Sequence, residues 1–205
     1  MERPILFNTD MVKAILSGQK TQTRRIVKPQ PNEGYRLDRV EGKFLRTKEF
    51  KDRTPDDEYI GTVVGQINPP YLIGDTLWVR ETWSKIEDFK NYTDLEIDKD
   101  LEYLYKCDDN GKEHSFIDVG VQKWHPSIHM PRSAARLFLK VTGARVERLQ
   151  DITEEDAKKE GFEDGPCLEA LDIFESTWNG IYGNWNDNPW VWVIEFERVC
   201  NDGNK

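Results

Sequence analysis

The alternation of hydrophobic and polar positions marks three segments of the chain. Residues 190–199 alternate between two sets of side chains, and residues 77–83 do the same after a Gly74-Asp75 turn. A third alternating segment covers residues 135–146. A period of two residues is typical of a β-strand with one buried face. These segments predict the main strands of the fold.

Apolar residues at helical spacing predict three helices. The first two follow residues that cap helix N-termini, and the second begins with a capping-box pattern of threonine followed by acids. Glycines lie where the helices are expected to stop. The predicted helices run from Thr9 or Asp10 to about Leu16, from Thr153 to Gly161, and from about Pro166 to Trp178, with Gly180 as the last cap.

Weaker patterns fill the rest of the chain. Residues 3–8 predict a short buried strand or an extended entry segment. The stretch from Pro29 to Pro70 is rich in Gly, Pro and charge and predicts hairpins or loosely ordered loop, with β-like pieces at 43–45 and 61–67. Residues 85–118 carry most of the excess negative charge and predict a solvated excursion, with a hairpin near residues 103–111.

Strands outnumber helices in this reading, and most connections suit antiparallel pairing. Regular alternation of strand and helix is missing, which disfavours a doubly wound α/β fold. We therefore predict an α+β, mainly β fold: a small closed β-barrel flanked by helices.

Charge adds one unexpected feature. The segment from Gly18 to Arg25 holds one lysine, two arginines and two threonines, although the formal net charge of the chain is −9. Like charges repel, so this clustering calls for an anionic partner or a chemical use. Gly18 fits the residue that ends the first helix, and we expect the basic residues to follow on a loop.

Composition excludes several classes of protein. At 205 residues the chain is long enough for one domain with a sizeable core. It has no apolar run long enough for a membrane helix and does not begin with a signal peptide, so we expect a cytoplasmic protein without a membrane partner. Three distant cysteines suggest reduced thiols, and Pro126 between His125 and His129 argues against a metal pair. We expect no metal and no cofactor.

Four short motifs occur in order along the chain: Gly18-x-Lys20-x-x-x-x-Arg25, Gly74-Asp75-x-Leu77-x-Val79, Thr153-Glu154-x-x-Ala157-x-x-Glu160 and Val193-x-x-Phe196. Together they resemble the ASCH domain, a member of the PUA-like superfamily of β-barrels. The opening Pro-x-Leu-Phe and the late Asn-Pro-Trp-Val-Trp-Val look like the longer ASCH proteins of phages and prophages.

The resemblance covers residues 3–30, 72–83 and 134–199. It implies a single ASCH/PUA-like domain over 1–205, with additions at 31–70 and 84–130. Many ASCH domains have an acidic residue where this chain has Thr23. A bacterial branch that hydrolyses N4-acetylcytidine has threonine there.

Carried over from that branch, the catalytic residues would be Lys20, Thr23 and Glu160. Amide hydrolysis needs an oxygen nucleophile, a base and a proton donor for the leaving amine. Thr23 can supply the hydroxyl or position a water, and Lys20 can act as base if nearby arginines lower its pKa. Glu160 can serve as the proton donor. We therefore expect an amidohydrolase that acts on a modified pyrimidine nucleoside.

Other readings stay open. A non-catalytic barrel would bind RNA or a modified nucleotide, and some ASCH proteins are nucleases, although no acidic metal motif supports a ribonuclease here. The basic segment would be purely structural if it paired with the acidic insertion of the same chain, and Glu160 would be a solvated surface residue. The oligomeric state is not readable. The expected contacts with substrate or nucleic acid are Thr21, Arg24, Arg25, Lys28, Trp78 and Trp83, the two tryptophans by stacking on a base.

Overall fold

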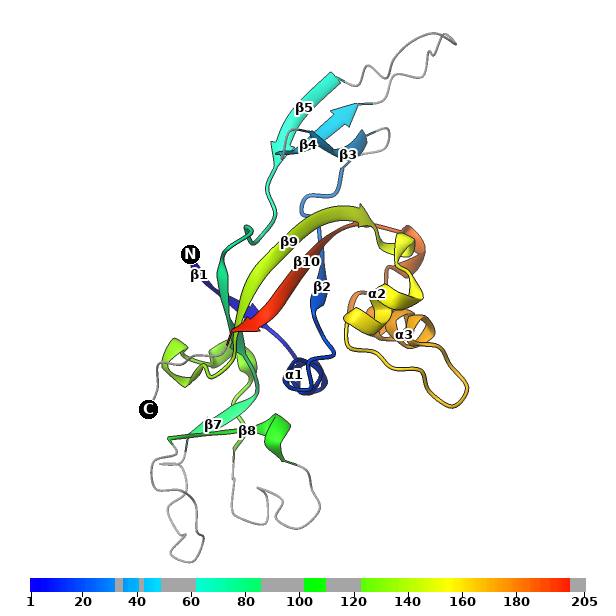
Figure 1. The fold of residues 1–205 in the computed structure, drawn as a ribbon. Helices are drawn as coiled ribbons and strands as arrows, with labels where there is room; N and C mark the ends of the chain where they lie inside the picture. Colours follow the sequence, from blue (N-terminus) through cyan, green and yellow to red (C-terminus); the bar gives the residue numbers. More distant parts are fainter. Residues whose placement is uncertain (32–34, 41–42, 49–61, 86–101, 110–122, 200–205) are drawn as a thin grey trace, which may run out of the picture. The chain divides into compact units, whose positions relative to one another are not determined.

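The computed structural model describes residues 1–31, 35–40, 43–48, 62–85, 102–109 and 123–199 (Figure 1). The fold is mixed α+β, with strands as the main elements and few helices. This agrees with the predicted class. The described residues form two compact units, the first within 1–20, 74–140 and 197–199, and the second within 21–73 and 141–196.

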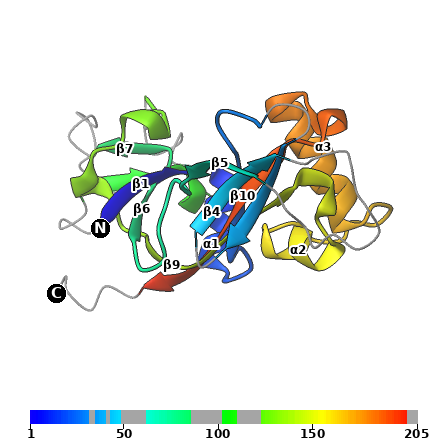
Figure 2. The same cartoon turned by 90° about the horizontal axis from the view of Figure 1, so that it is seen from above.

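Three strands organise the first unit. β1 (Glu2–Leu6) runs parallel to β6 (Thr76–Arg80), and the two lie side by side in Figure 2. β6 is antiparallel to the first residues of β9 (Phe138–Arg148). The central residues Ile5, Leu77 and Leu139 are buried, so the predicted strands are held mainly by apolar burial.

Helix α1 (Thr9–Leu16) follows β1 closely, as predicted, and buries Val12, Ala14 and Ile15. Its N-cap is Asn8, whose side chain accepts a hydrogen bond from the backbone N–H of Met11. The predicted caps, Thr9 and Asp10, are therefore inside the helix. The prediction passed over Asn8, although asparagine caps a helix as well as aspartate does.

Shorter elements complete the first unit. Tyr103 to Tyr105 form a strand that pairs with Trp83 to Lys85, whereas Lys106 to Asp108 form a 3₁₀ turn, so the first strand of the expected hairpin is shorter than predicted. The turn predicted at 110–111 and most of the acid-rich segment lie outside the described residues. The shorter elements of the first unit are β7 (Trp83–Lys85), β8 (Tyr103–Tyr105) and the short 3₁₀ helices η2 (Lys106–Asp108), η3 (Ser127–His129) and η4 (Arg132–Ala134).

The second unit contains two groups of strands. β10 (Trp190–Val199) lies between β9 and β2 (Gln22–Ile26), and β2 is antiparallel to it. A three-stranded antiparallel sheet is formed by β3 (Tyr35–Val40), β4 (Lys43–Lys48) and β5 (Thr62–Ile67) (Figure 1). The hairpin alternative predicted for residues 29–70 is confirmed for these described strands.

The core of the second unit lies where its helices pack on β10. The helical elements are η5 (Leu149–Asp151), α2 (Glu154–Lys159), α3 (Ala170–Tyr182) and η6 (Trp185–Asp187). Ala157 of α2 and the aromatic residues Phe174 and Trp178 of α3 bury against Val191 and Val193. Burying apolar side chains of this size removes enough surface from water to fix both helices on the strand.

Thr153 caps α2 as predicted, because its side chain accepts from the N–H of Asp156. Helix α3 differs from its prediction at both ends. It begins at Ala170 rather than Pro166. The Glu154 carboxylate accepts hydrogen bonds from the N–H groups of Ala170 and Leu171 at this start. The helix then continues through Gly180 and ends at Gly183, which has a positive φ of 66°.

The strand pairings given for the described residues leave the sheets open at their edges. The structure therefore shows a mixed, mainly β architecture, and the described pairings do not include the closure that the predicted barrel requires. None of the described helices has the length and apolar character needed to cross a membrane.

Candidate functional site

The basic stretch predicted as a loop is largely a strand. Gly18 ends α1 with a φ of 80°, and the N–H of Lys20 donates back to the carbonyl of Ala14. β2 then starts at Gln22 and pairs with β10, with Thr23 opposite Ile194. The loop prediction agrees with residues 18–21 and was wrong from Gln22 on, because backbone pairing and buried ion pairs, neither visible in the local sequence, stabilise these polar residues as a strand.

Successive side chains of β2 leave on opposite faces. Gln22 and Arg24 share one face, and both bond Asp156 of α2. Thr23 and Arg25 share the other face, where Arg25 Nη1 donates to Thr23 Oγ1 at 2.8 Å. Thr23 is buried and Arg25 is half-buried.

Arg24 is the centre of a buried ionic cluster. Its side chain has no exposed surface. Nη2 lies 2.5 Å from Glu147 Oε1 and 3.1 Å from Asp156 Oδ2, whereas Nη1 lies 3.2 Å from Glu160 Oε1. The guanidinium thus bonds carboxylates from β9, from α2 and from the residue that ends α2.

Arg145 extends this cluster. It pairs with Glu147 at 3.0 Å, with Asp156 at 3.4 Å and with Glu195 of β10. Burial tends to raise the pKa of Asp156, but the charge of Arg24, the amide of Gln22 and the charge of Arg145 outweigh it and lower that pKa. Asp156 is therefore held as a carboxylate, and the cluster has more acids than arginines.

Glu160 is buried, with 4% of its surface exposed, which excludes the solvated-surface alternative for this residue. It is the C-cap residue of α2, and its N–H donates to the carbonyl of Asp156 at 2.9 Å. The C-terminal end of a helix carries partial negative charge, which disfavours a carboxylate. The contact with Arg24 compensates for this.

A backbone hydrogen bond ties the start of β2 to the end of α2. The N–H of Thr21 donates to the carbonyl of Lys159 at 2.9 Å. Thr21 directly follows Lys20, and Lys159 directly precedes Glu160. The carbonyl of Thr21 in turn accepts from the N–H of Phe196 on β10.

Lys20 belongs to the first unit and is buried. Its Nζ lies 5.6 Å from the centre of the Phe7 ring, a cation–π distance. Since Thr23 and Glu160 are buried as well, all three predicted catalytic side chains are buried. Within the second unit the structure brings Glu160 to Arg24, while Thr23, on the opposite face of β2 from Arg24, receives Arg25.

The predicted contact residues have different surroundings. Thr21 and Lys28 are exposed, in contrast to Arg24. Trp78 is half-buried with the Arg80 guanidinium 5.5 Å from its ring. The ring centre of Trp83 lies 5.0 Å from that of His125 and 5.6 Å from that of Tyr103, so neighbours of its own unit already pack against this indole.

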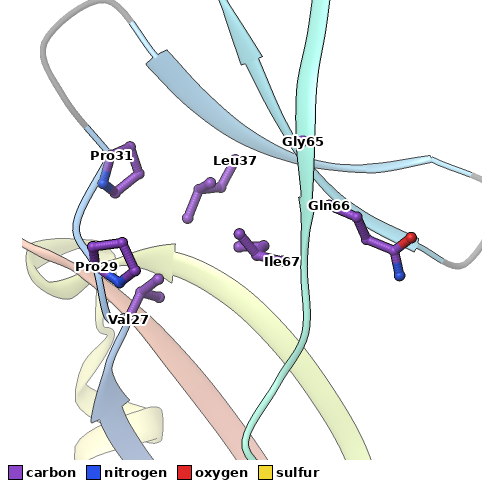
Figure 3. A pocket seen from close by; sticks show the side chains of 7 residues that line it. All are labelled: Val27, Pro29, Pro31, Leu37, Gly65, Gln66 and Ile67. Carbon is purple, nitrogen blue, oxygen red and sulfur yellow. The ribbon is translucent and has the colours of Figure 1, made fainter.

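A pocket of about 190 Å³ lies elsewhere in the second unit (Figure 3). Figure 3 shows proline and aliphatic side chains gathering around it, while Gln66 points away. Gln30 stabilises this region because its amide bonds the backbone of Val27 and Trp190. None of the predicted site residues lines the pocket, and no prediction from the sequence pointed to it. The lining residues are Val27, Pro29, Pro31, Leu37, Gly65, Gln66 and Ile67.

Sequence reasoning also missed a buried thiol in the first unit. Cys107 Sγ donates to Glu81 Oε2 at 3.0 Å, and Arg136 donates to Cys107, Glu81 and Asp108. Burial and the hydrogen bond to Glu81 raise the pKa of Cys107. A protonated thiol is a poor nucleophile, so this cluster is structural.

No group of three or more His, Cys, Asp or Glu residues in the described part of the chain is arranged to hold a metal ion. Comparison of the chain with models of protein families, with curated proteins and with solved structures found no match.

Proposed function

We propose that this protein is an amidohydrolase that removes the acyl group from N4-acylated cytidine-type nucleosides, on a PUA-like barrel of the ASCH type. The observation that carries the proposal is the hydrogen bond between Thr21 and Lys159, together with the contact between Arg24 and Glu160. The hydrogen bond from Thr21 to Lys159 joins the residue that follows Lys20 to the residue that precedes Glu160.

Chain connectivity supports the use of Lys20, Thr23 and Glu160 in one reaction. Lys20 is bonded to Thr21, whose N–H is held by the carbonyl next to Glu160. Thr23 follows Lys20 by three residues, so their Cα atoms are at most about 11 Å apart.

The surroundings of Thr23 suit a nucleophile. Arg25 donates to its hydroxyl oxygen, which leaves the hydroxyl hydrogen for transfer to a base. The guanidinium also stabilises negative charge that develops on that oxygen.

In the proposed reaction, Thr23 Oγ1 attacks the acyl carbonyl carbon while Lys20 takes the hydroxyl proton. The C–N4 bond then breaks, and Glu160 gives its proton to N4, which leaves as the amine of cytidine. Water then cleaves the Thr23 ester: its OH joins the acyl carbon to give the free acid, its other proton restores Glu160, and the proton held by Lys20 returns to Thr23 Oγ1.

A module that binds RNA without catalysis is less well supported. Arg24, one of the basic residues expected to contact phosphate, is surrounded by three carboxylates and has no exposed side-chain surface. Carboxylates close to the proposed site oppose phosphate, and a net charge of −9 opposes nucleic acid at longer range.

The test is to incubate wild-type protein with N4-acetylcytidine and to measure cytidine by chromatography. The matched pair Thr23→Ser and Thr23→Val separates loss of the hydroxyl from loss of volume. We expect turnover by wild type and by the serine variant, and a loss of at least about a hundredfold in the valine variant. Absence of wild-type turnover, combined with salt-sensitive binding of an RNA oligonucleotide, would instead favour the binding module.

A further inference from the structure

Arg24 divides its bonds in an unequal way. Nη2 serves two acids, Glu147 and Asp156, whereas Nη1 is directed to Glu160 at 3.2 Å. The guanidinium is planar and its nitrogens are rigidly spaced, so anchoring Nη2 fixes the direction in which Nη1 points. Arg24 therefore links the Glu160 carboxylate to two other acids through one side chain.

Stability alone is a weak reason for such an arrangement. Removing a guanidinium and several carboxylates from water costs free energy that their attraction repays only in part. An apolar side chain in the middle of β2 would avoid this cost, as it does at Val193 and Ile194 in the neighbouring strand. The cluster is better explained by what it holds in place.

Arg145 provides an internal comparison. It belongs to the same cluster and pairs with Glu147 and Asp156, as Arg24 does, but its third acid is Glu195. In the described part of the chain, Arg24 bonds Glu160 and Arg145 does not. The two side chains share their network and differ in the residue that they orient.

We infer that Arg24 is a positioning residue: it holds the Glu160 carboxylate, at the end of α2, in the orientation that proton transfer requires. The inference rests on the proposed function, since it gives Glu160 a reaction to serve. The Arg24 side chain has no exposed surface and bonds three carboxylates, so in this role it acts through Glu160.

The test compares Arg24→Met with Arg145→Met. It adds Arg24→Lys as a variant that keeps the positive charge but lacks the two rigidly spaced nitrogens of the guanidinium. The first readout needs no activity: folded protein is treated with a carbodiimide and an amine, and the modification of Glu160 is measured by peptide mass spectrometry. The second readout is kcat and KM for N4-acetylcytidine.

We expect Glu160 to be modified about tenfold faster in the Arg24 variants than in wild type or Arg145→Met, since a carboxyl that loses its fixed partner samples other orientations. We expect kcat to fall by up to about a hundredfold in Arg24→Met with KM little changed, and Arg24→Lys to recover part of the loss. If Arg24→Met fails to fold, the comparison of Arg24→Lys with Arg145→Met makes the same test.

Equal modification of Glu160 in the Arg24 and Arg145 variants would overturn the positioning role, as would equal losses of kcat. Absence of turnover by wild type would overturn the proposed function, and the modification rates would still decide whether Arg24 orients Glu160.

Discussion

At the scale of single residues, the candidate site is made of charges that find their partners inside the protein. The choice of Lys20, Thr23 and Glu160 as catalytic residues rests on a resemblance in the sequence and stays a prediction. The surroundings of Arg24 were not predictable, because the acids that bond it lie 123 to 136 residues further along the chain. No local pattern indicates which of many acidic residues folds back onto β2.

Gly143 shows how closely this cluster is packed. A Cβ at position 143 would overlap the Glu195 carboxylate, which pairs with Arg145. We expect Gly143→Ala to lower the free energy of unfolding by about 1–2 kcal/mol, measured by urea denaturation. In a Glu195→Ala background the same substitution should cost less, since most of the side chain it meets is gone. An equal loss of unfolding free energy in both backgrounds would show that contact between the Cβ at position 143 and Glu195 does not affect stability.

At the scale of elements, the sequence predicted strands and helices where apolar periodicity carried the signal. β9, β10 and α2 follow their predictions closely. β2 was missed because its residues are mostly polar and its burial depends on distant acids. α3 was shifted because its start is set by the Glu154 carboxylate, which belongs to another helix.

The two glycines near the end of α3 allow a matched test of this helix boundary. A Cβ at Gly180, inside the helix, meets nothing within 4 Å, whereas Gly183 has a positive φ that disfavours other residues. Gly180→Ala should raise the free energy of unfolding by about 0.5–1 kcal/mol through lower backbone entropy in the unfolded chain. Gly183→Ala should lower it by about 1 kcal/mol. Thermal or urea unfolding that gives both changes the same sign would contradict the observed helix end.

At the scale of the whole molecule, the excess of acids makes stability sensitive to pH. The mixed, mainly β architecture was predictable because strand periods recur along the chain. Barrel closure was not, because it depends on pairings between strand edges that sequence patterns do not specify. The arrangement of charges follows from the same long-range pairings.

Asp156 gives this sensitivity a testable form. Its pKa is lowered in the folded protein, so below the ordinary value of about 4 the unfolded chain binds a proton that the folded protein still excludes. The stabilisation is therefore complete above about pH 5, falls as the pH drops, and is lost below the folded pKa. Asp156→Asn should flatten the dependence of unfolding free energy on pH across this range.

The control for this experiment is salt. The ion pair between Lys158 and Asp164 is exposed, so added salt should screen its share of the pH dependence, whereas the share of Asp156 should persist. A pH profile that is unchanged by Asp156→Asn would contradict the role assigned to this cluster in stability.

The most direct measurement of the proposed activity is kcat/KM for deacetylation of N4-acetylcytidine by wild type, Lys20→Ala and Lys28→Ala. The two substitutions each remove one lysine near β2 in the sequence, but Lys20 is buried and Lys28 is exposed. We predict clear wild-type turnover, a loss of at least about a hundredfold in Lys20→Ala and a much smaller change in Lys28→Ala. Equal values for wild type and Lys20→Ala, or no cytidine formed by wild type, would contradict the account.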